Sequence, residues 1–523
     1  MPATASPRAA AGAMGRVRPW MGLVLLLLLC AAKGMWFAGD LTVPPDEDIL
    51  RDLGFIQGLR DGKLWDDPVQ AGAWRWYPPL VHALAAAAFR LTGADLLPAW
   101  VRAGAWLNLA TPLCFYLLVR RIGGAWAAFG ATAVLVLYGG ATMAGDEAAG
   151  YTPWTYTPAL VWPAFFLTAW LLIDRVGALR WRDAPFLGAA IALVFLAHTV
   201  PALLLAGMTA ATVVGTHGLR PRALAWLALT GGVALAGSLP FLLPLLLAYR
   251  LAIANPIPGA WVHGLLTPES ASRTLLLNLP GLLALPVLRS LPRPAAAAIA
   301  AWISLCLLGL ARHYACQAGI GAGCRVLVIA PHHYHVYLQA AWACLIGIVL
   351  ARWLARDATR VAVGLVAAAA VVGAIGTFQH AVDLDRRRLA QDAPDLVLDR
   401  TAHAWILRHT SPEALFATPL PDAPDQLGPT VGTVFAAGRR LVAPPAVHSN
   451  PYLPWSPRET QRQAALAGTK EGLCALHRAA TPGAGAWLLL PRDHPMPALD
   501  VALETAHHRL FRVPQTVCDP GLR

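Results

Sequence analysis

The chain has 523 residues, of which 57% are hydrophobic and only 13% are charged. Soluble proteins carry about a quarter charged residues, so this composition excludes an ordinary soluble enzyme and indicates a polytopic α-helical membrane protein. The formal net charge of +12 is spread over short loops between apolar runs. That pattern is typical of cytoplasmic anchoring by arginine and argues against a nucleic-acid partner.

The first apolar run extends from Trp20 to about Ala38 and follows three arginines. A signal peptide would begin in the same way, but its apolar core is shorter and ends at a small-residue cleavage site. We therefore predict an uncleaved span with a cytoplasmic N-terminus. A lipoprotein site at Cys30 is rejected because the preceding Leu29 is not small.

The first outer loop, residues 40–99, contains the most acidic stretch of the chain, with seven carboxylates between Asp46 and Asp67. Ionisable groups at a bilayer edge commonly mark functional sites. We therefore predict that this loop carries a catalytic acid or base. Residues 78–89 are apolar but too short for a span, which suits an interfacial helix.

Further apolar runs predict about 11 transmembrane helices in all. After the first, they lie at about 100–119, 124–142, 158–173, 184–216 (a hairpin of two, broken at His198), 223–247, 274–288, 295–311, a tenth ending at Arg352, and 361–379. Arginines collect in alternate loops, as the positive-inside rule expects. An odd number of spans places the C-terminal segment outside, although Arg386-Arg387-Arg388 at its beginning argue against this.

Residues 383–523 differ in composition from the rest. Short apolar strings at 414–417 and 486–490 alternate with helical stretches at 399–409 and 459–467, which predicts a small α/β fold. We therefore divide the chain into a transmembrane domain, 1–382, and a soluble extracytoplasmic α/β domain, 383–523. The segment has too many apolar residues for a disordered tail.

The cysteines separate by location. Those within expected spans fill space in the core: Cys30, Cys114, Cys306 and Cys344. Two pairs lie on the outer, oxidising side, where disulfide bonds persist: Cys316 with Cys324, and Cys474 with Cys518. We predict a disulfide bond within each pair.

Three features of the outer loops follow one another in a distinctive order. An acidic pair, Asp46-Glu47, follows the first span. A turn at 58–62 and the aromatic and proline residues at 74–79 lead into the short apolar helix. A second acidic pair, Asp146-Glu147, lies at the mouth of a later hairpin. Together with the expected number of spans and the outer C-terminal domain, these features resemble the GT-C class of integral membrane glycosyltransferases, specifically the bacterial relatives of protein mannosyltransferases and aminoarabinose transferases.

The resemblance implies inverting transfer of a sugar from a polyprenyl-phosphate donor to a glycan, lipid or protein acceptor, at the outer face of a bacterial inner membrane. In the family the first-loop acid is the general base, so Asp46 is the leading candidate and Glu47 the second. Asp146 or Glu147 would orient the acceptor or assist a divalent cation. The alternative for Asp46 to Asp48 is helix capping. The later acids of the loop are expected to be solvated: Asp52, Asp61, Asp66 and Asp67.

A lipid phosphate requires cations or hydrogen-bond donors. The outer-side candidates are Arg75, Arg250, Arg273, Arg312, Arg325, His332 and His333, and the aromatic residues expected at the interface are Trp74, Trp76 and Tyr77. The aminoarabinose-transferase relatives have a lysine where this chain has Tyr77, so another residue must contact the phosphate. His332 and His335 are spaced as metal ligands can be, but we favour a contact with the donor or an interfacial role.

Two other functions remain open. A transporter or flippase of lipid-linked sugars would place charges near mid-membrane and show repeated halves with broken helices, whereas the charges here lie in outer loops. A non-catalytic scaffold would leave the acidic loop unexplained. We expect His198 to satisfy the broken turn of its helix. The sequence does not reveal the sugar, the acceptor or a metal requirement.

Overall fold

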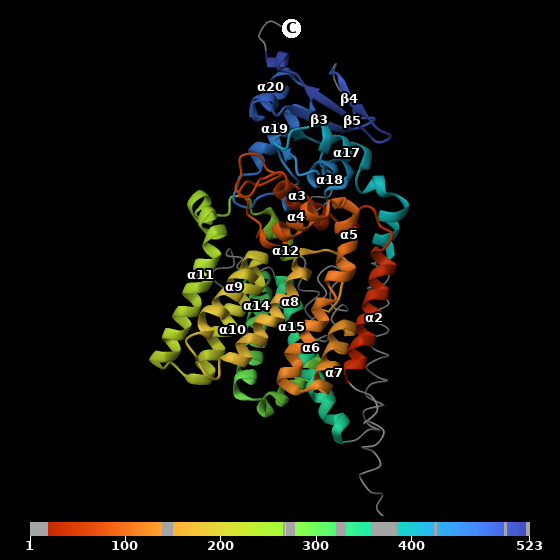
Figure 1. Ribbon diagram of the computed structural model, residues 1–523. Coiled ribbons are helices and arrows are strands. Elements are labelled where there is room, and N and C mark those ends of the chain that lie inside the picture. Colours follow the sequence, from red (N-terminus) through yellow and green to blue (C-terminus); the bar gives the residue numbers. More distant parts are fainter. Residues whose placement is uncertain are drawn as a thin grey trace, which may run out of the picture.

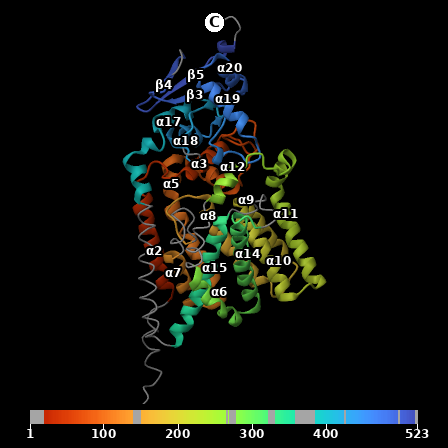
Figure 2. The same ribbon diagram turned by 180° about the vertical axis from the view of Figure 1, so that it is seen from behind.

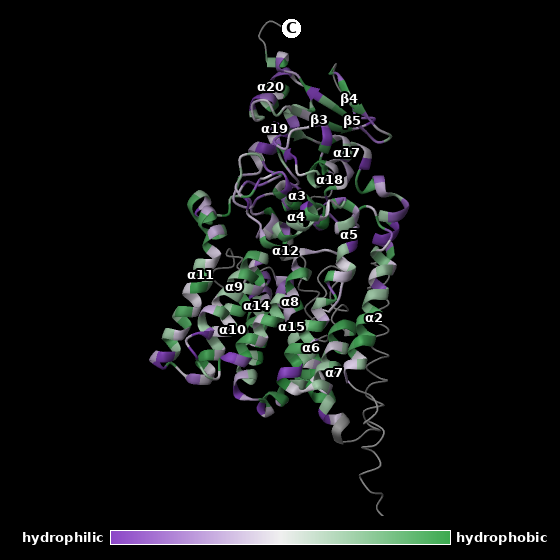
Figure 3. Ribbon diagram, viewed as in Figure 1, coloured by the Kyte–Doolittle hydropathy of each residue, from purple (hydrophilic) through white to green (hydrophobic). Residues whose placement is uncertain are grey.

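The computed structural model describes residues 19–138, 150–264, 267, 278–320, 331–356, 384–422, 426–495 and 499–518. Roughly parallel helices form a bundle, and a second body of short helices and a sheet sits on one end of it (Figure 1). The view from behind shows the same two tiers (Figure 2). The ribbon of the bundle is mostly hydrophobic, while hydrophilic residues gather in the upper body and at the lower helix ends (Figure 3).

The bundle consists of long apolar helices. They are α2 (Pro19–Ala38), α6 (Ala110–Gly123), α7 (Ala125–Tyr138), α8 (Thr157–Arg175), α9 (Asp183–Ala197), α10 (Thr199–His217), α11 (Pro221–Tyr249), α14 (Arg293–Gln317) and α15 (Pro331–Arg356), with the 3-10 turn η2 (Leu285–Ser290). Six of the described helices are long and apolar enough to cross a bilayer, or seven if one bent pair counts as a span. The chain is thus a polytopic helical membrane protein. The expected span at 361–379 lies outside the described residues.

Aromatic packing holds the centre of the bundle together. Trp162 and Phe165 of α8 contact Tyr337 of α15, with ring centroids 4.0 and 4.7 Å apart, and Phe165 also meets Trp302 of α14 at 5.1 Å. At Gly347 of α15 a Cβ atom would lie 2.3 Å from the backbone nitrogen of Ala131 in α7. Only glycine lets these two helices approach so closely.

The first outer loop forms three helices, α3 (Glu47–Arg60), α4 (Leu80–Thr92) and α5 (Leu96–Leu107). Helix α4 begins after Pro78-Pro79, because proline fits the start of a helix but not its interior. It ends at Gly93, whose φ of 65° lies in the left-handed region. The chain then bends by 117° into the next helical segment. The short helix predicted at 78–89 is therefore present as α4, and the chain turns sharply after it.

The C-terminal segment combines a mixed sheet with short helices. Its elements are η3 (Pro394–Leu396), α17 (Arg400–His409), β1 (Leu415–Ala417), α18 (Gly428–Ala436), β2 (Arg440–Leu441), η4 (Ala446–His448), α19 (Ser456–Leu466), α20 (Lys470–Ala479), β3 (Ala486–Pro491), β4 (Val501–Glu504), β5 (His508–Val513) and η5 (Gln515–Cys518). The described strands follow the order β2-β1-β3-β5-β4. Strand β1 is parallel to both of its neighbours, whereas β5 is antiparallel to β3 and β4. A disulfide bond between Cys474 and Cys518 joins α20 to η5.

A buried polar network connects α17 to the sheet. The Asp399 carboxylate caps α17 by accepting the Ala402 N–H at 2.9 Å, and its other oxygen lies 2.9 Å from Nδ1 of His508 in β5. Nε2 of the same ring lies 3.0 Å from Thr430 Oγ1 in α18. Burial opposes ionisation of Asp399, but hydrogen bonds led by that of His508 lower its pKa to about 2.

The first outer loop and the C-terminal segment share one hydrophobic core. Leu50 and Leu53 of α3 are buried in the same cluster as Val431 and Val434 of α18. At Gly54 a Cβ atom would lie 2.4 Å from the Phe435 carbonyl oxygen, so this contact requires glycine. In Figure 1, α3 accordingly lies directly against α18. The C-terminal segment thus packs on the loop as well as on itself.

Candidate active site

The acidic pair predicted to be catalytic lies at the beginning of α3. Asp46 caps this helix by accepting the Asp48 N–H at 2.9 Å, so the capping role considered from the sequence is present. Its other oxygen lies 3.7 Å from Nη2 of Arg386, and the same guanidinium donates through Nη1 to the Tyr156 hydroxyl at 3.2 Å. Asp46 is therefore held by its own helix and by two distant parts of the chain, around Tyr156 and Arg386.

The surroundings change the proton affinity of both acids. Burial raises the pKa of Asp46, and nearby Asp48 adds to the rise, while Arg386 opposes it. Burial and the charge of Asp46 raise the pKa of Glu47 to about 7. A carboxylate with a pKa near neutrality is well matched to accepting a proton at physiological pH. No ion pair of Glu47 occurs among the described residues.

A second carboxylate of α3 forms a buried network with His82. The Asp52 side chain is only 1% exposed and lies 3.2 Å from Nε2 of His82 in α4. It also accepts a hydrogen bond of 2.7 Å from the hydroxyl of Thr157, the first residue of α8. Burial would raise the pKa of Asp52, but Arg51 and His82 hold it below its ordinary value. The expectation that Asp52 is solvated is wrong.

Tyr156 and Thr157 are adjacent in the chain, and they bind two different acids. Tyr156 contacts Asp46, which caps α3, and Thr157 contacts Asp52 within α3. Nε2 of His82 faces Asp52, and Nδ1 lies 3.3 Å from the Pro78 carbonyl oxygen, so both ring nitrogens face oxygen atoms. These contacts join α3, α4 and the start of α8 at the junction between the bundle and the upper body. The network thereby fixes the orientation of the helix that begins with Asp46 and Glu47.

The other acids expected to be solvated also have defined partners. Asp67 is buried and accepts the N–H groups of Val69 and Gln70, each at 3.0 Å. Asp61 pairs with Arg439 at 2.9 Å. Only the side chain of Asp66, at 56% exposure, fits the sequence expectation.

Aromatic and histidine rings follow one another from the first loop into the bundle. Tyr77 stacks on Phe55 and lies 6.1 Å from the ring of His198, between α9 and α10. The His198 ring lies 5.2 Å from His333, which in turn lies 4.2 Å from His332 in the first turn of α15. His198 thus connects Tyr77 to the two predicted phosphate ligands, His333 and His332. The sequence predicted only that His198 satisfies the broken turn of its helix.

Arg51 is a further cation of this region. Its guanidinium lies 2.7 Å from the Asp48 carboxylate and 3.3 Å from that of Asp52. It also lies 4.8 Å from the centre of the Tyr77 ring, in a cation–π contact. Arg51 therefore joins the acidic helix to the row of rings.

The remaining predicted ligands lie elsewhere. Arg75 is buried, donates to the Lys63 carbonyl oxygen at 3.1 Å and lies over the Phe55 ring; burial lowers its pKa to about 10. The exposed Trp74 donates its backbone N–H to the Tyr249 hydroxyl at 2.7 Å, and Trp76 contacts Tyr77 edge-on at 5.5 Å. Arg250 is exposed at the end of α11.

Several predicted site residues lie outside the described residues: Asp146, Glu147, Arg273, Arg325 and Cys324. The proposed Cys316–Cys324 bond is therefore a prediction only. Within the described ranges, no group of three or more His, Cys, Asp or Glu side chains is arranged to hold a metal ion.

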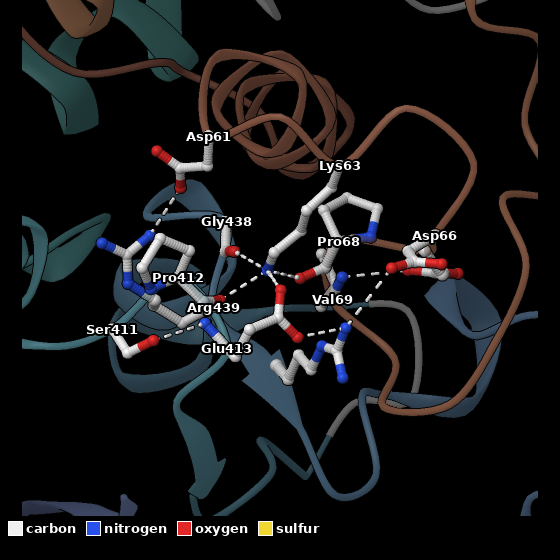
Figure 4. A network of polar contacts seen from close by, with 12 residues as sticks. Asp61, Lys63, Asp66, Pro68, Val69, Ser411, Pro412, Glu413, Gly438 and Arg439 are labelled. Atoms are coloured by element: carbon white, nitrogen blue, oxygen red, sulfur yellow. Dashed lines mark hydrogen bonds and ion pairs between the residues drawn. The ribbon is translucent and has the colours of Figure 1, made fainter. Parts of the chain in front are cut away.

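A charged network connects the first loop to the C-terminal segment (Figure 4). The buried Lys63 ammonium lies 3.2 Å from the Gly438 carbonyl oxygen and also bonds the carbonyl of Pro412. Its Nζ lies 3.6 Å from the Glu413 carboxylate, which also pairs with Arg440. Beside it, the Val69 carbonyl accepts the Leu441 N–H at 2.6 Å, so the loop pairs with the edge of the sheet.

Sequence reasoning missed Asp52, His82, Thr157, Tyr156 and Arg386 as parts of this site. His82 carried one local signal, because it follows the Pro-Pro pair one turn into the short helix. In the sequence, Arg386 indicated only an argument against placing the C-terminal segment outside. Partners of Asp52 are 30 and 105 residues away along the chain, and no local pattern indicates such pairs.

No known family model matches the sequence, and no curated protein matches it. The fold, in contrast, is similar to that of solved membrane proteins. The structure of ArnT from Cupriavidus metallidurans bound to undecaprenyl phosphate is 14% identical, with a TM-score of 0.57 over 95% of this chain and 99% of that chain. The ArnT structure in the apo state has a TM-score of 0.53 at the same identity, over 96% of this chain and 99% of that chain.

A third solved structure is archaeal. The oligosaccharyltransferase AglB from Archaeoglobus fulgidus, in complex with an inhibitory peptide and a dolichol-phosphate, is 11% identical, with a TM-score of 0.50 over 90% of this chain and 69% of that chain. ArnT and AglB are both GT-C glycosyltransferases. The resemblance predicted from the outer loops is thus confirmed at the level of the fold.

Proposed function

We propose that this protein is a membrane glycosyltransferase that moves a sugar from a polyprenyl-phosphate donor to a glycan, lipid or protein acceptor. One observation carries the proposal: Glu47, with a pKa of about 7, lies beside Asp46 at the junction of bundle and upper body, in a chain with the fold of a protein solved with undecaprenyl phosphate. Fold alone does not assign chemistry, so the paired acids are needed for the argument.

The acids supply the base that the reaction requires. In an inverting transfer the acceptor oxygen attacks the anomeric carbon, the bond from that carbon to the phosphate breaks, and a base takes the acceptor proton. Asp46 is occupied by the Asp48 N–H and faces Arg386. We therefore assign proton removal to Glu47 and the orientation of the acidic pair to Asp46, which reverses the order favoured from the sequence.

The histidines near Tyr77 are assigned to the leaving phosphate. His332 and His333 lie in the first turn of α15, where the positive end of the helix dipole favours an anion. The His333 ring lies 5.2 Å from that of His198, which lies 6.1 Å from Tyr77, and the His332 ring lies 4.2 Å from that of His333. This position would compensate for the lysine that the aminoarabinose-transferase relatives carry where this chain has Tyr77.

The proposal places the upper body outside a bacterial inner membrane. Hydrophilic residues gather at the lower helix ends, opposite the sheet (Figure 3), and Arg120 in the last turn of α6 and Arg175 in the last turn of α8 supply the positive charge that the positive-inside rule expects on the cytoplasmic side. Polyprenyl donors lie in the bilayer, so a site at the junction of bundle and upper body is accessible to them. Whether Asp146, Glu147 or a divalent cation takes part remains a prediction.

Two experiments test the function. Mass spectrometry of envelope glycans and lipids after gene deletion should reveal the loss of one sugar modification, which defines donor and acceptor. The purified protein, reconstituted with both, should then release polyprenyl phosphate. Release should fall at least a hundredfold in Glu47→Gln. The matched control is Glu471→Gln, an exposed acid in the first turn of α20. Transport of the intact donor without release would instead support the flippase.

A further inference from the structure

A groove lies between α6 and α8 at the end of the bundle opposite the sheet. Its volume is about 370 Å³, and it is lined by Leu117, Arg120, Arg121, Leu167 and Trp170. The arginines occupy the last turn of α6, and Trp170 lies near the end of α8. The groove is therefore remote from the acidic pair and belongs to no part of the proposed reaction.

The walls of the groove are apolar and face outward from the bundle. Leu117 is 40% exposed and Leu167 is 43% exposed. Both belong to apolar helices of the bundle, and α8 is long enough to cross a bilayer. An exposed leucine on such a helix faces lipid chains, and tryptophan near a helix end suits the membrane interface. The walls thus match an acyl chain.

Two arginines, Arg120 and Arg121, form the charged end of the groove. Arg120 makes no side-chain hydrogen bond or ion pair among the described residues. Arg121 pairs with Asp174 at 2.9 Å, but Asp174 also binds Arg175 at 3.1 Å. Arg175 also lies 3.6 Å from Asp183, so three arginines (Arg120, Arg121 and Arg175) face two carboxylates, and the groove keeps a net positive charge next to its apolar walls.

We propose that this groove binds an anionic phospholipid of the leaflet at that end. The lipid phosphate would contact Arg120 and Arg121, whose guanidinium groups match phosphate oxygens. One acyl chain would lie along Leu117, Leu167 and Trp170. Basic pockets between transmembrane helices on the side rich in arginine bind such head groups. The lipid would stabilise the contact between α6 and α8.

Native mass spectrometry of the full-length protein in detergent tests the proposal. Titration with phosphatidylglycerol should give one tightly bound lipid, with weaker binding of phosphatidylcholine. Arg120→Gln should weaken phosphatidylglycerol binding by about fivefold, the effect of one arginine near a membrane surface. Leu167→Trp should also weaken it by filling the groove, without any change of charge.

The matched control is Arg182→Gln. Arg182 is exposed in the loop after α8, at the same end of the bundle, and does not line the groove. Its substitution should leave the affinity unchanged. An equal loss in Arg182→Gln would show attraction to diffuse surface charge and overturn the proposal. Full affinity in Leu167→Trp, or equally tight binding of sn-glycerol 3-phosphate without acyl chains, would also overturn it.

Discussion

Glu47→Gln is the most decisive substitution, because its effect depends on pH in a way that the structure specifies. Burial and Asp46 raise the pKa of Glu47 to about 7. A general base acts in its deprotonated form, so kcat/KM should be highest above pH 7 and fall as the pH decreases. At pH 6 only about a tenth of the base is deprotonated. The wild-type rate there should be about a tenth of its maximum.

The two variants of the acidic pair should differ in kind. Glu47→Gln should lower kcat/KM by about 10²–10⁴ and abolish the inflection near pH 7. Asp46→Asn removes a negative charge that raises the pKa of Glu47. Its inflection should therefore move to lower pH, and its rate above pH 7 should fall less than that of Glu47→Gln.

The assay is release of polyprenyl phosphate by reconstituted protein between pH 5 and 9, with Glu471→Gln as the control. An ordinary solvated carboxylate, with a pKa of about 4.3, would give a flat profile over most of this range. A flat wild-type profile, or an inflection that persists at pH 7 in Glu47→Gln, would refute the assignment. A greater loss in Asp46→Asn than in Glu47→Gln would return the base to Asp46.

Three further substitutions test the framework of the site. Asp52→Ala leaves His82 and Thr157 buried without their hydrogen-bond partner and should destabilise the protein by about 1–3 kcal/mol, measured by thermal unfolding in detergent. An unchanged Tm would contradict the buried network. Lys63→Met leaves buried carbonyl groups without their donor and should cost about 1–3 kcal/mol, while Lys63→Arg should recover part of the loss. Asp399 has a pKa of about 2, below its unfolded value of about 3.9, so its contribution of about 2–3 kcal/mol is present above pH 4 and lost as the pH falls toward 2. Asp399→Asn should remove this pH dependence of the unfolding free energy.

Local sequence patterns predicted many of the elements. The apolar strings at 414–417 and 486–490 correspond to β1 and β3, and the helical stretch at 399–409 corresponds to α17. The Pro-Pro pair located the beginning of α4. These elements depend on side-chain periodicity and on proline and glycine geometry, which act within a few residues. The position of the acidic loop after the first span was readable for the same reason.

Local sequence patterns could not predict which acids of the first outer loop are buried and which are solvated. Seven carboxylates lie within 22 residues, from Asp46 to Asp67, and the sequence alone offers no basis for telling a buried one from a solvated one. Asp52 is buried because His82 of α4 and Thr157 of α8 contact it. The prediction that Asp52 is solvated was wrong because burial depends on which helices pack against a residue, and not on its neighbours along the chain.

The sequence by itself determined that the protein is embedded in a membrane, because hydrophobicity summed over long runs is a property of composition. It also located an acidic loop with the features of a glycosyltransferase. Only the tertiary structure decided that Arg386 and Tyr156 hold Asp46, and that Glu47 titrates near neutrality. The first property depends on charges brought together across hundreds of residues, and the second arises mainly from the burial of Glu47 beside Asp46. Both exist only after the loop has packed between the bundle and the C-terminal segment.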